Sequence, residues 1–403
     1  MKIITFGIHT RVNSKMLLKS FFLTALCFLL VTACSNSNPQ MSESTQIPRI
    51  TVKSTPTPII TTTDKTKTKE LTQTDVTTYY NSGVSYLELG KYQEAIEAFT
   101  KAIEINPRSA AIFYNRGTAY YVLEEYQNAV EDYTRAINLD PSDAWAYSNR
   151  GVAYDELGQH QKAIEDYSNA IKLAPSDVVT YRNRGAAYDL LGQYESAIED
   201  YTQAIKLDPS DSDMYDTRGA SYYILGEYEK AIKDYTKAIE LNPSDAAAYN
   251  IRGDCYSELG EYEKAIEDYS KAIELNPSDA VTYNYRGVSY FLSGNTQQSI
   301  KDYTKAIELA PELPNSYGNR GSSYYFIKEY IKAIKDYTKV IQLSPTDFIS
   351  YYNRGISYRQ IGEHQKAIED FTKVIDLGQG QIDTDKVKNL LTDSQNILLE
   401  IKK

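Results

Sequence analysis

Aromatic and small apolar residues recur along residues 76–381 with a fixed spacing of 34 residues. Within each 34-residue unit, positions 4, 8 and 11 carry an aromatic residue, a glycine and a tyrosine. Positions 20, 24 and 27 carry a small residue, an aromatic residue and a second small residue. Spacings of three, four and seven residues place these side chains on one face of a helix, so each unit predicts two amphipathic helices. The predicted hairpins are 76–109, 110–143, 144–177, 178–211, 212–245, 246–279, 280–313, 314–347 and 348–381.

The ends of the predicted helices are also marked. Position 32 is proline from Pro107 to Pro345, which ends the second helix, and a following Ser-Asp can cap the next first helix. One hairpin cannot bury its apolar face alone, so neighbouring hairpins must stack and the last one needs a cover. Within 382–403, an apolar stripe predicts a capping helix at about residues 384–401; its members are Val387, Leu390, Leu391, Ile397, Leu398 and Ile401.

The period and the framework residues together resemble the tetratricopeptide repeat family. The aligned glycines run without an insertion from Gly83 to Gly355, and the resemblance covers 76–381. It implies an all-α, right-handed superhelical solenoid of helix-turn-helix repeats with a C-terminal capping helix. It also implies a concave groove lined by the first helices, and a protein that binds other molecules rather than an enzyme.

The N-terminal segment 1–33 has the features of a signal peptide. Its residues 21–33 are an apolar run too short to span a bilayer, and the run closes on Val31-Thr32-Ala33-Cys34. This ending resembles the lipobox of bacterial lipoproteins, which implies cleavage before Cys34 and acylation of that residue, for example with palmitate. The alternative is a plain secretory signal with a chance cysteine. Translation from Met16 rather than Met1 would give a more usual signal length.

Residues 34–75 and the overall charge limit the remaining possibilities. Ser, Thr and Pro dominate 35–75, which predicts a disordered tether between Cys34 and the repeats. The net charge of −11 argues against nucleic acid as a partner. His9, His160 and His364 are scattered, so we expect no metal site, and we expect no cofactor and no catalytic set. Cys255 has no histidine near it and is interpreted as a small buried thiol.

Two charged positions change together along the repeats. Arg stands at position 7 and Asp at position 23 in repeats 2–9, whereas repeat 1 has Ser82 and Ala98. One interpretation is a row of arginines that binds acidic ligands. The other, which we favour, is a ladder of intramolecular pairs, because a desolvated guanidinium needs a carboxylate.

The chain has 37 Tyr, and the tyrosines outside the framework concentrate on the first helices. Positions 4, 11, 17 and 24 hold thirty of them, which we expect in the core. The others fall at positions 5, 6 and 12, roughly opposite the packed face, and position 6 is often asparagine. The predicted peptide-binding groove consists of Tyr80, Asn81, Tyr114, Asn115, Tyr121, Trp145, Asn149, Asn183, Tyr223, Tyr285, Phe291, Asn319, Tyr325, Tyr352 and Asn353.

The asparagines resemble the ladder in the superhelical repeats of O-linked N-acetylglucosamine transferase, which grips the backbone of an extended peptide. Thr217, Ile251 and Tyr285 interrupt it here. In the alternative interpretation the asparagines only bond water, and some of the tyrosines pack between adjacent first helices. The central groove is rich in Asp and Glu, which favours neutral or basic segments as partners.

The sequence therefore predicts a scaffold that binds extended protein segments in its groove and is anchored to a membrane of the bacterial envelope, with a role in the assembly of envelope complexes. Ser35 after the cysteine favours the outer membrane if the cell has two. The alternative function is binding of envelope glycans by the groove aromatics, since tyrosine and tryptophan also stack on sugars.

Overall fold

The computed structural model describes residues 73–378 and 384–401, and within these ranges it contains nineteen α-helices and no strand. Eighteen of the helices form nine hairpins and the last covers the ninth hairpin. The prediction of an all-α stack of helical hairpins with a C-terminal capping helix is confirmed. The signal segment and the tether lie outside the described residues.

Each hairpin has a first and a second helix. The first helices are α2 (Gln73–Glu88), α4 (Ala110–Val122), α6 (Ala144–Glu156), α8 (Val178–Leu190), α10 (Ser212–Ile224), α12 (Ala246–Glu258), α14 (Ala280–Leu292), α16 (Pro314–Phe326) and α18 (Phe348–Gln360). The second helices are α3 (Tyr92–Ile105), α5 (Tyr126–Leu139), α7 (His160–Leu173), α9 (Tyr194–Leu207), α11 (Tyr228–Leu241), α13 (Tyr262–Leu275), α15 (Thr296–Leu309), α17 (Tyr330–Leu343) and α19 (His364–Leu377). The capping helix is α20 (Thr384–Ile401).

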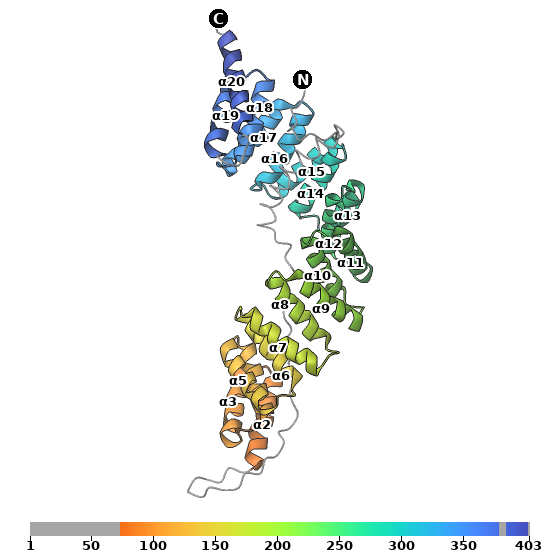
Figure 1. Ribbon diagram of the computed structural model, residues 1–403, viewed down its shortest axis with the longest axis vertical. Helices are drawn as coiled ribbons and strands as arrows, with labels where there is room; N and C mark the ends of the chain where they lie inside the picture. The colour runs from red at the N-terminus through yellow and green to blue at the C-terminus, as the bar shows by residue number, and fades with distance from the viewer. Residues whose placement is uncertain (1–72, 379–383, 402–403) are drawn as a thin grey trace. The chain divides into compact units, whose positions relative to one another are not determined.

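The described helices divide into two compact units. The N-terminal unit comprises residues 73–241 with α2–α11, and the C-terminal unit comprises residues 242–401 with α12–α20. Within each unit every helix packs on the one before it and the one after it, so the hairpins follow one another in chain order (Figure 1). Packing between sequence neighbours is what stabilises a solenoid.

The centre of each hairpin is an aromatic ring of the second helix that lies against a glycine of the first. Tyr167 is fully buried, and a Cβ added to Gly151 would lie 2.7 Å from its ring. At Gly83 the same Cβ would lie 2.5 Å from the ring of Phe99. In the nine repeats the nearest ring atom would lie 2.5–3.1 Å from such a Cβ, so a larger residue at position 8 would have to displace a buried ring.

Eight arginine–aspartate pairs join the two helices of repeats 2–9. In each pair, Nε and Nη2 of the guanidinium donate to the two carboxylate oxygens over 2.7–2.9 Å. The pairs are Arg116–Asp132, Arg150–Asp166, Arg184–Asp200, Arg218–Asp234, Arg252–Asp268, Arg286–Asp302, Arg320–Asp336 and Arg354–Asp370. This Arg–Asp ladder confirms the structural interpretation of the two positions, because every arginine is already bound to a carboxylate.

The ladder also explains many of the tyrosines. The guanidinium carbon of Arg150 lies 5.7 Å from the ring centre of Tyr147 and 5.9 Å from that of Tyr154, distances typical of cation–π contacts. Burial disfavours the charged form of Arg150, but Asp166 outweighs it and raises the pKa of the guanidinium. Most rings at positions 4 and 11 are therefore half-buried, and the expectation that they belong to the core is wrong for them. The aromatic residues at position 24 are buried in every repeat, and Tyr80 and Tyr114 at position 5 are core residues as well.

The ends of the helices follow the predicted signals. Asp143, Asp211 and Asp279 accept hydrogen bonds from backbone N–H groups at the start of the next first helix, so the aspartate of Ser-Asp is the cap. The turn inside most hairpins uses a glycine with positive φ. Glu124 and Lys328 replace it in repeats 2 and 8, with φ of 61° and 66°.

The capping helix α20 covers the apolar end of repeat 9. Val387 is 1 % exposed and packs with Phe371 and Val374 of α19, and Leu390 and Leu391 lie against the same cluster. Across the ranges 73–378 and 384–401, no helix is both long and apolar enough to cross a membrane.

Candidate functional site

The first helices of successive repeats share one face within each unit. They contact one another directly, as α2 does α4 in the N-terminal unit and as α14 does α16 in the C-terminal unit. Side chains at positions 5, 6, 12 and 13 bond or stack from one repeat to the next, so these positions lie where the first helices meet. We call this surface the first-helix face, and it contains all the residues of the predicted groove except Trp145, which lies at position 2 of α6.

Polar groove residues of the N-terminal unit are mostly buried. The Asn115 amide donates to the Tyr80 hydroxyl over 3.0 Å, and Asn149 donates to Tyr114 in the same way. These four side chains are at most 2 % exposed. The expectation that they are exposed to a ligand is wrong, because each tyrosine at position 5 covers the asparagine at position 6 of the next repeat and satisfies its amide.

Asn183 is also buried, at 1 % exposed, and its amide nitrogen has no acceptor among the described residues. Asn81 is exposed, since no described repeat precedes it. A continuous row of asparagines open to a peptide is therefore absent from this unit.

The other aromatic groove residues of the N-terminal unit are half-buried. Tyr121 stacks on Tyr126 with ring centres 5.4 Å apart, and its hydroxyl donates to Glu156 of the next repeat over 3.2 Å. Tyr223 stacks on Tyr228 at 5.6 Å, and Trp145 is half-buried as well. Burial and the charge of Glu156 raise the pKa of Tyr121, so its hydroxyl stays protonated.

Groove residues of the C-terminal unit are more accessible. Asn319 donates to Asn284 over 3.1 Å, yet Asn319, Asn353, Tyr285 and Tyr352 are all only half-buried. Position 5 is Asn284 in repeat 7 and glycine in repeat 8, so no tyrosine covers the next asparagine in these repeats.

An aromatic cluster lies at the ends of α14 and α16 and the start of α17. Phe291 and Phe326 meet edge to face with ring centres 5.5 Å apart, and Tyr325 stacks on Tyr330 at 5.4 Å. Phe326 is 55 % exposed, an unusual state for phenylalanine. We call Phe291, Tyr325, Phe326 and Tyr330 the aromatic cluster.

The comparisons with known proteins agree with this architecture. The family model described as "Tetratricopeptide repeat" matches seven segments, namely 144–177, 178–211, 217–245, 246–279, 280–313, 314–347 and 348–379, which together exceed half of the chain. A related model described as "TPR repeat" matches 83–123 and 119–158. The chain belongs to the tetratricopeptide repeat family. As a tetratricopeptide repeat protein it mediates protein–protein interaction, and its family is one of scaffolds.

Solved structures include similar tetratricopeptide repeat proteins. The C-terminal part of a repeat-containing protein from Cytophaga hutchinsonii shares 22 % identity over 60 % of this chain and 98 % of its own, with a TM-score of 0.54. MamA shares 30 % identity over 40 % of this chain and 95 % of its own, with a TM-score of 0.39. YrrB, described as having an unusual peptide-binding site, shares 24 % identity over 46 % of this chain and 96 % of its own, with a TM-score of 0.43. No curated protein sequence matches the chain significantly.

Buried carboxylates alter the acidic character expected of this tetratricopeptide repeat groove. Asp189 is 6 % exposed and accepts hydrogen bonds from Tyr201 and Ser221. Burial raises its pKa to about 6, against the lowering effect of the two hydroxyls. Asp155 is also buried, between His160 and Tyr167, whereas Glu156 is exposed. Part of the negative charge predicted for the central groove is therefore internal to the fold.

The remaining chemical candidates in the tetratricopeptide repeats are structural. Cys255 is a free, fully buried thiol, as predicted, and burial raises its pKa. The His160–Asp155 contact of 2.9 Å was not foreseen from the sequence, because position 17 packs near position 12 only once the hairpin has formed. Among the described residues, no group of three or more His, Cys, Asp or Glu is placed to hold a metal ion.

Proposed function

We propose that the chain is a membrane-tethered scaffold that binds extended segments of partner proteins along its first-helix face, with the aromatic cluster of the C-terminal unit as the anchor. The observation that carries the proposal is the exposure of Phe326, at 55 %, beside three further aromatic rings. An exposed group of aromatic rings marks a recognition surface, since tyrosine and phenylalanine bury a large area at small entropic cost.

The surroundings of the cluster suit a peptide. Asn319 and Asn353 lie half-buried on the same face, and an amide side chain can both donate to and accept from a peptide group of any sequence. The two side chains lie on successive first helices, α16 and α18, which contact each other. An extended segment that crosses the two helices would meet an amide on each and an aromatic ring at its side.

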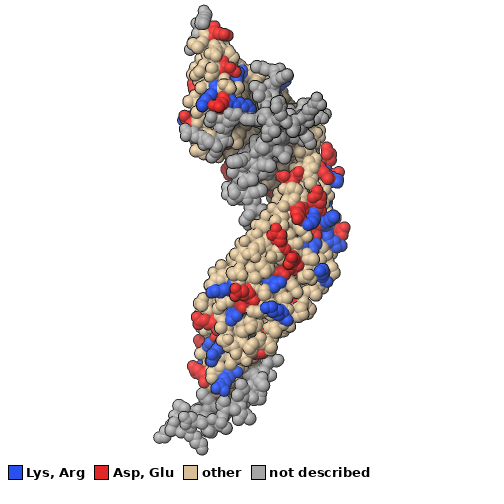
Figure 2. All heavy atoms as spheres, in the orientation of Figure 1, with Lys and Arg blue, Asp and Glu red and all other residues tan. Residues whose placement is uncertain are grey.

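Surface charge narrows the choice of segment. On the part of the N-terminal unit drawn in Figure 2, basic and acidic side chains are interleaved over an otherwise neutral surface. Such a surface offers no broad basic patch for a polyanion, and the net charge of the whole chain is −11. The net negative charge and the exposed Phe326 favour neutral or weakly basic apolar segments as partners.

Anchoring and location are proposed from the sequence alone. The lipobox-like ending at Cys34 supports acylation, and the Ser/Thr/Pro-rich tether would hold the repeats away from the membrane. We propose the bacterial envelope, with the outer membrane favoured where there are two. Labelling cells with a palmitate analogue tests this: the wild-type chain should incorporate the label and Cys34→Ala should not. Label in the Cys34→Ala chain, or none in the wild type, would contradict the anchor.

Photo-crosslinking in cells tests the binding function. A photoreactive residue at position 319 should capture a protein, whereas the same residue in place of the exposed Lys335 on α17 should capture far less. Capture at position 335 alone would contradict the first-helix face as the binding surface. Capture of envelope polysaccharide at position 319 would support the alternative, glycan binding by the aromatic residues.

A further inference from the structure

Seven of the eight arginines of the Arg–Asp ladder make a third hydrogen bond, to the preceding repeat. The Nη1 of each donates to a serine or threonine hydroxyl at position 25 of that repeat over 2.9–3.0 Å. We call each such bond a rung. The seven rungs are Arg116–Thr100, Arg150–Thr134, Arg184–Ser168, Arg218–Thr202, Arg286–Ser270, Arg320–Thr304 and Arg354–Thr338.

The last hydroxyl of the series, Thr372, receives no arginine. It donates to the Ile368 carbonyl over 2.8 Å, as Thr338 donates to Ile334 over 2.7 Å. Thr338 also accepts from Arg354, so the two bonds are compatible on one hydroxyl. Among the described residues, no donor bonds to the hydroxyl oxygen of Thr372. Thr372 is exposed, whereas Thr338 and the other residues at position 25 are half-buried.

The capping helix covers the apolar core of repeat 9 but provides no arginine for Thr372. In α18 the buried residues Ser350 and Ser357 lie seven positions apart, and in α20 Val387 and Ser394 are buried with the same spacing. This register places α20 as a tenth first helix, in which Leu391 stands where the other repeats have arginine. Leucine packs on the apolar cluster but has no N–H to donate to Thr372.

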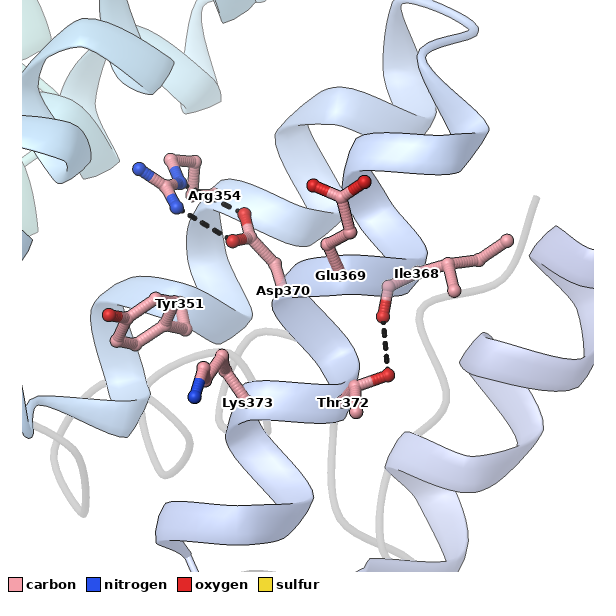
Figure 3. Close-up of a pocket in the computed structure, with 7 residues that line it drawn as sticks. All are labelled: Tyr351, Arg354, Ile368, Glu369, Asp370, Thr372 and Lys373. Atoms are coloured by element: carbon pink, nitrogen blue, oxygen red, sulfur yellow. Dashed lines mark hydrogen bonds and ion pairs between the residues drawn. The ribbon is translucent and has the colours of Figure 1, made fainter.

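A shallow depression of about 440 Å³ lies over this part of repeat 9. Figure 3 shows Thr372 at one edge, the Arg354–Asp370 pair and Tyr351 on the other side, and Glu369 and Lys373 along α19. The two preceding repeats carry Lys301 and Lys335 at the position of Glu369, so this end of the ladder is more acidic than its neighbours.

We propose that this depression is a docking site for an arginine side chain of a partner protein. Beside the hydroxyl at position 25, the chain itself places a guanidinium seven times. A rung guanidinium donates to a hydroxyl and to a carboxylate at once, and a lysine ammonium lacks that planar fork. A second copy of the chain stacking its first repeat here would not fit, because repeat 1 has Ser82 at the arginine position. The site is built from α18 and α19 away from the aromatic cluster, so it stands or falls independently of the proposed groove.

Titration of the full-length chain with two fluorescent peptides tests the proposal, one alternating glycine with arginine and one alternating glycine with lysine. Wild type should bind the arginine peptide at least threefold more tightly. Thr372→Val should remove this preference, and Thr372→Ser should keep it, since serine serves as the acceptor at Ser168 and Ser270. Equal binding of the two peptides by wild type, or an unchanged preference in Thr372→Val, would overturn the proposal.

A second variant tests the site without a ligand. Leu391→Arg supplies the guanidinium from α20 itself, so it should raise the melting temperature of the chain and remove the preference for the arginine peptide. A melting temperature at or below that of wild type together with a retained preference would contradict an arginine site at Thr372.

Discussion

The two units have the same framework but different first-helix faces. In the N-terminal unit, the tyrosines at position 5 cover the asparagines of the next repeat, and both are buried. In the C-terminal unit, no tyrosine stands at position 5 before Asn319 or Asn353, and both asparagines are half-exposed beside an accessible aromatic cluster. A tyrosine at position 5 thus covers the asparagine of the next repeat, although Asn183 is also buried where position 5 of the preceding repeat is Ser148.

The comparison separates the contacts that all repeats have in common from the residues that differ between repeats. The glycine–aromatic contact and the Arg–Asp ladder occur in both units and set the stability of the hairpins. The residues at positions 5, 6, 12 and 13 vary from repeat to repeat, and we propose that binding specificity depends on them. Substitutions in matched positions of the two units can test this division.

The largest effect is expected in the shared ladder. Asp234→Ala in the N-terminal unit and Asp336→Ala in the C-terminal unit should each lower the free energy of unfolding by about 3–5 kcal/mol, because each leaves a largely buried guanidinium without its carboxylate. Adding Arg218→Leu or Arg320→Leu, respectively, should recover much of the loss. Urea unfolding of the single and double variants measures this, and simple additivity would show that the pairs do not interact.

A smaller effect should distinguish the two units. Asn149→Ala should cost about 1–3 kcal/mol, because it removes a buried hydrogen-bond partner of Tyr114. Asn353→Ala should stay within about 0.5 kcal/mol, since this side chain is only half-buried. Equal losses in thermal or chemical unfolding would mean that the two faces do not differ as described.

The pH dependence of stability should differ by unit as well. The pKa of Asp189 is raised by burial to about 6 and that of Asp254 to about 7, above the unfolded value of 3.8. Between the two pKa values of each carboxyl group, the folded chain holds a proton that the unfolded chain has lost. The free energy of unfolding therefore rises as pH falls through the folded pKa, and this contribution is lost as pH rises through it. For Asp189 the gain from pH 7 to pH 5 is roughly 1–1.5 kcal/mol.

Substitution of each carboxyl group by asparagine shows which part of the pH dependence of stability it causes. Asp189→Asn should flatten the stability profile around pH 6, and Asp254→Asn should flatten it about one pH unit higher. Melting temperatures measured from pH 5 to pH 8 give both profiles. A wild-type curve with no slope in this range, or variants that keep it, would rule out these two carboxyls as its source.

The smallest effect concerns the hairpin turns. Glu124 and Lys328 occupy left-handed backbone conformations that the other repeats give to glycine. Glu124→Gly in one unit and Lys328→Gly in the other should each stabilise the chain by about 0.5–1 kcal/mol, because glycine adopts this conformation without steric cost. Calorimetry of the two variants checks this, and a lower melting temperature would show that the side chains contribute more than their backbone strain costs.

The contacts inside each hairpin could be predicted from the sequence, because the residues that make them lie within one repeat and recur in the others. Gly151 and Tyr167 recur at fixed positions in every repeat, and the joint absence of Arg and Asp from repeat 1 indicated that the two side chains pair. The exposure of the groove residues could not be obtained in this way. A helical wheel gives the side of the helix on which Asn115 lies, but its burial depends on Tyr80 in the preceding repeat.

The lack of an arginine partner for Thr372 could not be predicted from the sequence either. The threonine fits the repeat pattern, and Leu391 fits an ordinary apolar stripe. Only the register of α20 against α19 shows that leucine stands in the place of arginine. Departures from a repeat become informative once the neighbouring repeats show what each position normally contacts.

The central claim is that partners bind the first-helix face of the C-terminal unit rather than that of the N-terminal unit. Phe326 and Ile224 offer a matched pair for testing it, since both stand at position 13 and are 55 % and 43 % exposed. A photoreactive phenylalanine analogue at each position, in otherwise wild-type chains in cells, measures the yield of crosslinked protein. The account predicts a severalfold higher yield from position 326, and an equal or higher yield from position 224 would contradict it.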